Sequence, residues 1–235
     1  FKAAVDDRSS ASCLIPSSPA LHHLFGPIAI SIWMAMVLLA AVLARRRWPE
    51  QRETSRKVVH IGTGAVIPLA WLFQVSWVVA VPFAAMVTAI TAINHQWRII
   101  PAVEDVDRSS FGTVAYGLSI TILLLLFWPT RTDAVTAGVL VMAFGDGLAG
   151  LIGRSLPSAQ WSVIGQTKSM AGTLTMAIVS ALVLFSLSAL SATSVAWSAM
   201  IGLSLLATGL EQLSPLGIDN LTVPLAVGLL WATLT

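Results

Sequence analysis

Long apolar segments alternate with short polar ones along most of the chain, and this pattern predicts helices that cross a membrane. Eight apolar segments approach the roughly 20 residues that a span needs. They cover residues 24–44, 57–73, 75–93, 112–128, 134–152, 172–190, 195–210 and 220–235. The second, seventh and eighth are shorter or more polar than the others. We therefore expect an all-α, polytopic helical bundle with about eight transmembrane helices, or seven.

Composition supports the membrane assignment. The chain has 235 residues, of which 56% are hydrophobic and 10% charged, whereas soluble domains average about 25% charged residues. We expect one transmembrane domain over 24–235, preceded by a polar tail at 1–23 that lacks a secretory signal pattern. Cys13 has no partner for an internal disulfide and fits no metal-binding spacing. His22 and His23 are interpreted as ordinary flanking residues.

The basic residues are distributed unevenly between the two sides of the predicted bundle. If the loop after the first span is cytoplasmic, alternation places ten Lys and Arg side chains on that side and three on the other. This bias follows the positive-inside rule and leaves both termini on the non-cytoplasmic side. A bacterial plasma membrane, a thylakoid and a plastid envelope all fit.

The polar segments 52–64, 94–111, 145–172 and 211–220 all reach the predicted cytoplasmic face. An enzyme that draws a charged substrate from the cytoplasm has this layout. A transporter more often places its polar groups near the membrane midplane.

Asp146 lies inside the apolar segment "VLVMAFGDGLAGLIGR", residues 139–154. An ionisable residue in a span is a functional candidate by default. In a helix, Ala143, Gly147, Gly150 and Arg154 share one face. The alternative is a helix-packing stripe with an incidental acid that pairs with Arg154.

Lys168 and Ser169 come just before the sixth span, in "WSVIGQTKSMAGT". A lysine and a hydroxyl at a helix start can hold phosphate, because the helix N-terminus offers free N–H groups and a favourable dipole. Lys168 is otherwise an interfacial lysine whose ammonium reaches the water.

Carboxylates gather near the C-terminus in "EQLSPLGIDNLTVPL", residues 211–225. Glu211 closes the seventh span, and Asp219 and Asn220 open the eighth. Asp or Asn at a helix start is often only a cap. All three at one membrane level instead indicate a site.

Two further polar groups stand at the same predicted face. Arg56, Lys57 and His60 open the second span, and the spacing of four puts Arg56 and His60 on one helical face. Anchoring of the helix end is the alternative. Asp107 and Arg108 precede the fourth span and are weaker candidates, because they also suit a helix start.

Together these groups place several carboxylates and several cations at one membrane face. Carboxylate oxygens suit Mg²⁺, and Lys and Arg neutralise a polyphosphate, which is most of what phosphoryl transfer requires. A lipid alcohol can approach such a site sideways from the bilayer.

Four motifs in order, "RKVVHIGTG", "FGDGLAGLIGR", "KSMAGTLTM" and "EQLSPLGIDNLTVPL", resemble the polyprenol kinase family. The resemblance covers about residues 55–235 and looks most like its phytol kinase branch. It implies a multi-span enzyme, with its active site at the cytoplasmic face, that transfers phosphate from CTP to an isoprenoid alcohol such as phytol. It implies no nucleic-acid partner and leaves the oligomeric state open.

Carried over by position, the resemblance implies roles for the candidate residues. Asp146, Glu211 and Asp219 hold Mg²⁺, with Asp146, Lys168 and Asp219 as the catalytic set. Phosphate or nucleotide contacts fall to Arg56, Lys57, His60, Arg154, Lys168, Ser169 and Asn220. Asp219 and Asp107 are candidates for the base. Gly150 departs from the family pattern, since some relatives carry an acid there.

Rival interpretations remain. Among kinases, the alternative is an enzyme whose acceptor is dolichol, another polyprenol or diacylglycerol. From another class, the chain is a proton- or cation-coupled transporter with Asp146 as its relay, or a structural membrane subunit. The transporter predicts solute uptake without a nucleotide, and the structural subunit tolerates Asp146→Ala.

Overall fold

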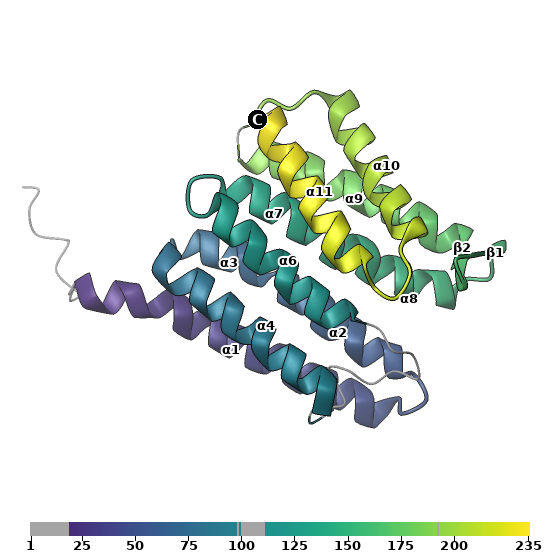
Figure 1. Ribbon diagram of the computed structural model, residues 1–235, viewed down its shortest axis with the longest axis horizontal. Helices are drawn as coiled ribbons and strands as arrows, with labels where there is room; N and C mark the ends of the chain where they lie inside the picture. Colours follow the sequence, from purple (N-terminus) through teal and green to yellow (C-terminus); the bar gives the residue numbers. More distant parts are fainter. Residues whose placement is uncertain (1–18, 98, 100–110, 192) are drawn as a thin grey trace, which may run out of the picture.

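Helices run alongside one another through the computed structural model, which describes residues 19–97, 99, 111–191 and 193–235 (Figure 1). The predicted Asp107 and Arg108 lie outside these residues. The first part of the chain forms α1 (Pro19–Arg47), α2 (Arg52–Gly64), α3 (Val66–Leu72) and α4 (Trp77–Trp97). The second part forms α6 (Gly112–Phe127), α7 (Thr132–Leu140), a π-helix η1 (Val141–Asp146), α8 (Gly147–Ser155), α9 (Met170–Leu190), α10 (Trp197–Leu213) and α11 (Asp219–Leu234).

These helices coincide with the predicted apolar segments, and the all-α class is confirmed. Four stretches among the described residues are long and apolar enough to cross a membrane: Phe25–Arg47, Trp77–Trp97, Thr132–Ser155 and Met170–Leu190. Gly112–Phe127 and Asp219–Leu234 are shorter apolar helices. The second predicted segment is divided into α2 and α3, which meet at Ala65. The chain is therefore a helical membrane protein.

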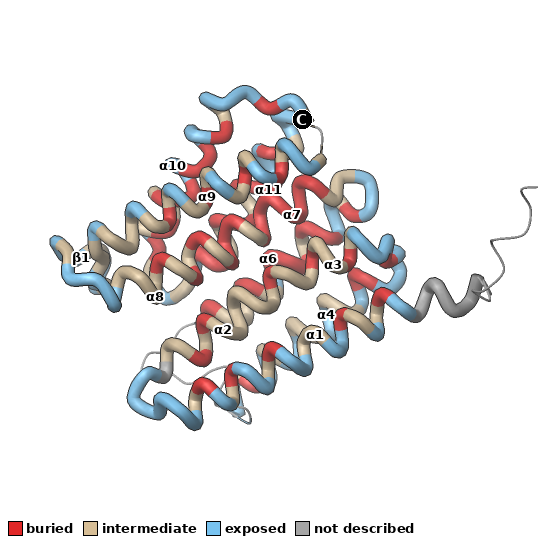
Figure 2. The backbone as a smooth tube through the Cα atoms, turned by 180° about the vertical axis from the view of Figure 1, so that it is seen from behind, coloured by how far each residue is buried: buried red, intermediate tan, exposed pale blue. Residues whose placement is uncertain are grey.

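The helical run from α7 through η1 to α8 forms the centre of the bundle. In its most apolar stretch 61% of the residues are buried, against 22% for α9 and 11% for α4. Figure 2 shows many of the buried residues in this part of the bundle. Small residues allow the close packing. A Cβ added to Gly138 would lie 2.3 Å from the Pro224 carbonyl oxygen, so α7 and α11 contact each other through their backbones.

A stripe of small residues on η1 and α8 faces α2. Added Cβ atoms at Gly147 and Gly150 would meet Ile61 and Lys57 at 2.4 and 2.6 Å. The predicted common face of these glycines is therefore confirmed. The π-helix ends at Asp146, directly before the stripe. π-Helical turns are rare and occur frequently at functional sites.

A short β-hairpin interrupts the helical pattern between α8 and α9. Strands β1 (Gln160–Val163) and β2 (Gln166–Ser169) pair antiparallel, with Val163 opposite Gln166. Ile164 and Gly165 form the two-residue turn, with φ values of +48° and +73°. A type I′ turn needs positive φ at both of its central residues, and Ile164 and Gly165 meet this requirement. This element was not predicted. It lies at the end of the bundle opposite the C-terminus (Figure 1).

Candidate active site

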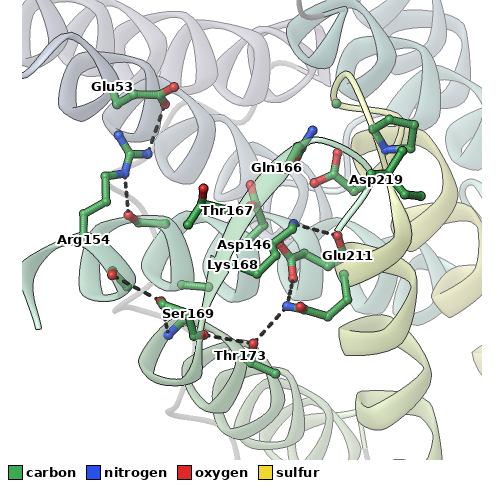
Figure 3. Close-up of a pocket in the computed structure, with 18 of the residues that line it drawn as sticks. Glu53, Asp146, Arg154, Gln166, Thr167, Lys168, Ser169, Thr173, Glu211 and Asp219 are labelled. Carbon is green, nitrogen blue, oxygen red and sulfur yellow. Dashed lines mark hydrogen bonds and ion pairs between the residues drawn. The ribbon is translucent and has the colours of Figure 1, made fainter. Parts of the chain in front are cut away.

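A polar cavity of about 790 Å³ opens where the hairpin meets the helices. Its walls come from α2, η1, α8, the hairpin, α9, the end of α10, the start of α11 and the connection between these two helices. Polar side chains dominate the lining: Glu53, Arg56, Lys57, Asp146, Arg154, Gln160, Gln166, Thr167, Lys168, Ser169, Thr173, Glu211, Gln212, Asp219 and Asn220. Segments far apart in the chain thus share one cavity, part of which Figure 3 shows.

Asp146 is held by two residues of α2. The Lys57 ammonium donates to Asp146 Oδ2 at 2.6 Å and to the Asp146 carbonyl oxygen at 3.1 Å. His60 Nε2 lies 3.4 Å from the same carboxylate oxygen and 3.2 Å from the carbonyl oxygen of Met142. Because Lys57 crosses directly over Gly150, the missing side chain at that position leaves room for the ammonium.

A second ion pair lies on the other side of the cavity. Lys168 on β2 donates to a carboxylate oxygen of Glu211 and, at 2.8 Å, to the Glu211 carbonyl oxygen. The Gln212 amide donates to the other Glu211 oxygen at 2.8 Å and to Thr173 at 2.9 Å. The strand therefore delivers the lysine to the last turn of α10, and Figure 3 shows these contacts.

Three carboxylates from different elements converge between the two lysines. One oxygen from each of Asp146, Glu211 and Asp219 lies within 4.8 Å of the others. The Asn220 amide donates to Asp219 Oδ1 at 3.2 Å and so orients that carboxylate. Oxygen donors grouped in this way fit a hard divalent cation such as Mg²⁺, which binds through a few carboxylates and keeps several waters.

Charged groups also line the outer edge of the cavity. Glu53 accepts from Arg56 at 2.8 Å and lies 3.3 Å from the Arg154 guanidinium (Figure 3). Burial opposes ionisation of the Glu53 carboxylate, but the guanidinium groups of Arg56 and Arg154 outweigh it and hold the pKa of Glu53 below its ordinary value. Two arginines are thereby fixed at the mouth of a cavity that already holds two lysines.

Most predicted site residues meet in this cavity. Lining residues include Arg56, Lys57, Asp146, Arg154, Lys168, Ser169, Glu211, Asp219 and Asn220. His60 stands behind Asp146 rather than in the lining. Ser169 caps α9 by accepting from the Gly172 N–H at 3.2 Å. Lys168 and Ser169 therefore stand just before this helix, as expected, although they also belong to strand β2.

Some lining residues were not predicted. Glu53 precedes Arg56 by three positions in the sequence, a spacing that allows a helical ion pair. Thr173 and Gln212 lie within predicted motifs without having been singled out. Gln160 and Gln166 depend on the hairpin, and so the sequence interpretation missed them.

Three proteins of similar sequence are named as kinases of isoprenoid alcohols. A phytol kinase of Synechocystis sp. is 38% identical over 222 residues, which cover 88% of this chain and 94% of that protein. Phytol kinase 1, chloroplastic, of Arabidopsis thaliana is 26% identical over 241 residues, covering 93% and 79%. Farnesol kinase, chloroplastic, of Arabidopsis thaliana is 28% identical over 134 residues, covering 52% and 43%.

No protein-family model and no solved structure matches the chain. The similarity to the phytol kinase of Synechocystis sp. extends over nearly the full length of that protein and over most of this chain. The chain therefore belongs to the polyprenol kinase family, in its phytol kinase group.

Proposed function

We propose that this chain is a phytol kinase that transfers the terminal phosphoryl group of CTP to the hydroxyl of phytol. The observation that carries the proposal is the convergence of Asp146, Glu211 and Asp219 within 4.8 Å, in a cavity that also holds Lys57 and Lys168. Three anionic oxygen donors beside two ammonium groups suit a metal-bound triphosphate. The names of the relatives supply phytol as the acceptor.

The carboxylates of Asp146, Glu211 and Asp219 would hold Mg²⁺. When bound, the ion neutralises phosphate charge and draws electrons from phosphorus. Lys57 and Lys168 now pair with two of these carboxylates, so their ammonium groups already lie beside the place where phosphate oxygens would bind. Arg56 and Arg154 add positive charge at the cavity mouth.

In the transfer step, the alcohol oxygen forms a bond to the γ-phosphorus of CTP. The bond between that phosphorus and the β,γ-bridging oxygen breaks, so that CDP leaves with the bond's electron pair. The alcohol proton passes to the Asp219 carboxylate, which Asn220 orients. Lys168 stabilises the charge that develops on the leaving oxygen, because preorganised cations are worth most in a site that excludes water.

Amide side chains suit recognition of the cytosine base. Gln166 and Lys168 are two positions apart on β2 and therefore point to the same side of the strand. Gln160 and Gln212 line the same cavity. Amides provide both donors and acceptors, which match the amino group and carbonyl of cytosine.

The site is assigned to the cytoplasmic face of an eight-span bundle with both termini outside. The basic bias of the sequence supports this orientation. The gathering of the hairpin, the start of α2 and the α10–α11 connection at one end of the bundle also supports it (Figure 1). CTP would then enter from the cytoplasm and phytol from the bilayer.

A direct assay tests the proposal. The purified full chain in lipid nanodiscs receives CTP or ATP with phytol, farnesol, dolichol or diacylglycerol, with and without EDTA. We expect phytyl phosphate and CDP in equal amounts, and no product with EDTA. Farnesol is the second expected acceptor, because a farnesol kinase is among the relatives. Nucleotide-independent solute uptake by proteoliposomes of the same protein, with no phosphorylated alcohol, contradicts the kinase and favours a transporter.

A further inference from the structure

A second cavity, almost entirely apolar, lies between α1, α3, α4 and α6. It has a volume of about 90 Å³, and its walls include Ile30, Ile67, Ala80, Ala84 and Ile120. Among its lining residues only Thr63 has a polar side chain. We call this cavity the apolar groove. It is separate from the polar cavity and shares no lining residue with it.

The groove begins where the polar cavity ends. On α2, Lys57 lines the polar cavity, His60 follows one turn later, and Thr63 opens the groove after one more turn. On α6, the groove extends from Gly117 to Leu124, which is about 10 Å along a helix that rises about 1.5 Å per residue. The groove therefore runs away from the site and into the bundle.

His60 and Tyr116 line neither cavity, but they lie beside residues of both. Their ring centroids lie 4.3 Å apart, and His60 is also 3.4 Å from the Asp146 carboxylate. Tyr116 directly precedes Gly117, the first residue of α6 in the groove. One side chain, His60, thus lies beside both the Tyr116 ring and the Asp146 carboxylate.

Tyr116 carries a buried hydroxyl that has no hydrogen-bond partner among the described residues. The side chain is buried, with the residue 4% exposed. Among the residues that the structure describes, none forms a hydrogen bond with its hydroxyl oxygen. A Cβ added to Gly64 would lie 3.1 Å from this oxygen. Leaving a buried hydroxyl without a hydrogen bond costs free energy, so a ligand that supplies a polar group here gains that interaction.

We propose that the apolar groove binds the part of the isoprenoid alcohol's hydrocarbon tail nearest the hydroxyl, and that Tyr116 hydrogen-bonds the hydroxyl of that alcohol beside His60. This inference rests on the proposed function and locates its acceptor. The tail covers the apolar walls of the groove, which lipid would otherwise cover. The hydroxyl of the alcohol forms a hydrogen bond with the Tyr116 hydroxyl at the end of the groove nearest Asp146. The acyl chain of an ordinary phospholipid fits the walls but offers no hydroxyl to Tyr116.

Groove-filling variants test the position of the tail. Ala84 lies nearer the site along α4 and Ala80 one turn further away, opposite the Leu124 end of the groove. Ala84→Phe is expected to raise KM for both phytol and farnesol by at least about tenfold, the scale of a steric mismatch in an apolar pocket. Ala80→Phe should raise KM for both alcohols as well, because both tails are longer than the roughly 10 Å that the groove extends along α6. Leu125→Phe, at an exposed position of α6, is the matched control. Equal alcohol KM values in all three variants overturn the groove assignment.

Tyr116→Phe tests the hydroxyl. We expect KM for the alcohols to rise about five- to tenfold, as for loss of one neutral hydrogen bond, with KM for CTP unchanged. The unfolding temperature without alcohol should not fall, because the hydroxyl forms no hydrogen bond with any part of the chain that the structure describes. An unchanged alcohol KM contradicts the role of Tyr116.

A binding measurement separates the groove from the reaction. Phytol alone, without nucleotide, should raise the unfolding temperature of the wild type but not of Ala84→Phe. If the wild type shows this shift but phosphorylates no alcohol, the proposed function fails and the groove stands. If phytol stabilises both proteins equally, the groove assignment fails whatever the activity.

Discussion

The Lys57 ammonium lies 2.6 Å from the Asp146 carboxylate, although the two residues are 89 positions apart in the chain. Gly150 makes the contact possible, because its missing side chain leaves the space that the end of Lys57 occupies. The pair joins α2 to the C-terminal end of η1 and sets one wall of the polar cavity. Both side chains are largely buried, with exposures of 6% and 13%.

Asp146→Asn should separate catalysis from folding. The asparagine oxygen still accepts from Lys57, so the protein should remain folded in the membrane while transfer falls by at least about a thousandfold, as for loss of one charged group in a preorganised site. Asp146→Ala leaves the Lys57 ammonium buried without its carboxylate and should destabilise the fold by about 3–5 kcal/mol. Transfer assays and thermal unfolding in the same nanodiscs measure both effects. Full activity in Asp146→Asn contradicts its assigned role.

Two glycines of the same stripe should respond differently to alanine. At Gly150 a new Cβ meets the flexible end of Lys57 at 2.6 Å, whereas at Gly147 it meets the Ile61 side chain at 2.4 Å in the contact between α2 and α8. Gly150→Ala should therefore lower transfer by displacing Lys57, with little loss of stability. Gly147→Ala should lower the unfolding temperature, because overpacking a tight contact costs about 1–3 kcal/mol. Equal loss of stability in both variants would show that Lys57 cannot shift.

The helices and much of the site could be predicted from sequence, because apolar length and in-span charge are local signals. Asp146 was identified in this way, as was the small-residue face that includes Gly147. The ion-pair partner of Asp146 was not identified. Arg154, eight positions away, was the local alternative, but α2 brings Lys57 to Asp146, and Arg154 instead contacts Glu53. The partner of a buried charge depends on how helices that are distant in the sequence pack together. The spacing of residues within one helix carries no information about that packing.

The hairpin escaped prediction for a different reason. Its turn, Ile164-Gly165, lacks the Asn or Asp that usually marks a two-residue type I′ turn. A β-branched residue at positive φ is unusual, so the local signal points away from the conformation that the chain adopts. Without the hairpin, Lys168 was placed only in the segment before a helix, and Gln166 had no assigned place.

Glu211→Gln should weaken metal dependence. It removes one anionic donor from a group of three, and the Mg²⁺ concentration for half-maximal transfer should rise by about tenfold or more, because the affinity of a carboxylate site depends on its number of charged ligands. Asp133→Asn is the matched control, since Asp133 is equally buried but accepts from Trp231 at 3.0 Å, away from the cavity. It should lower stability and leave the Mg²⁺ requirement unchanged. An unaltered Mg²⁺ titration in Glu211→Gln contradicts metal binding by Glu211.

The Glu53 carboxylate should make stability depend on pH in the acid range. Its pKa in the folded protein lies below the ordinary value of 4.5, so the unfolded chain binds the proton more tightly. The stabilisation is therefore complete above pH 4.5 and is lost as the pH falls below that value. Wild type and Glu53→Gln should differ in unfolding temperature at neutral pH and converge in acid. A difference that stays constant with pH would exclude ionisation of Glu53 as its cause.

The hairpin turn provides the last prediction, because two glycines have equal room but different backbones. An added Cβ meets nothing within 4 Å at either Gly165 or Gly202, yet Gly165 has a φ of +73° whereas Gly202 lies within α10. Gly165→Ala should strain the turn by about 1–2 kcal/mol and loosen the strand that carries Gln166 and Lys168, so KM for CTP should rise several-fold. Gly202→Ala should leave KM unchanged and stabilise the helix by up to about 1 kcal/mol. Measuring CTP kinetics and unfolding for both variants isolates the backbone effect, since neither substitution creates a steric clash. If Gly165→Ala binds CTP as the wild type does, the hairpin does not position the nucleotide, and the glutamine and lysine on β2 act independently of the turn.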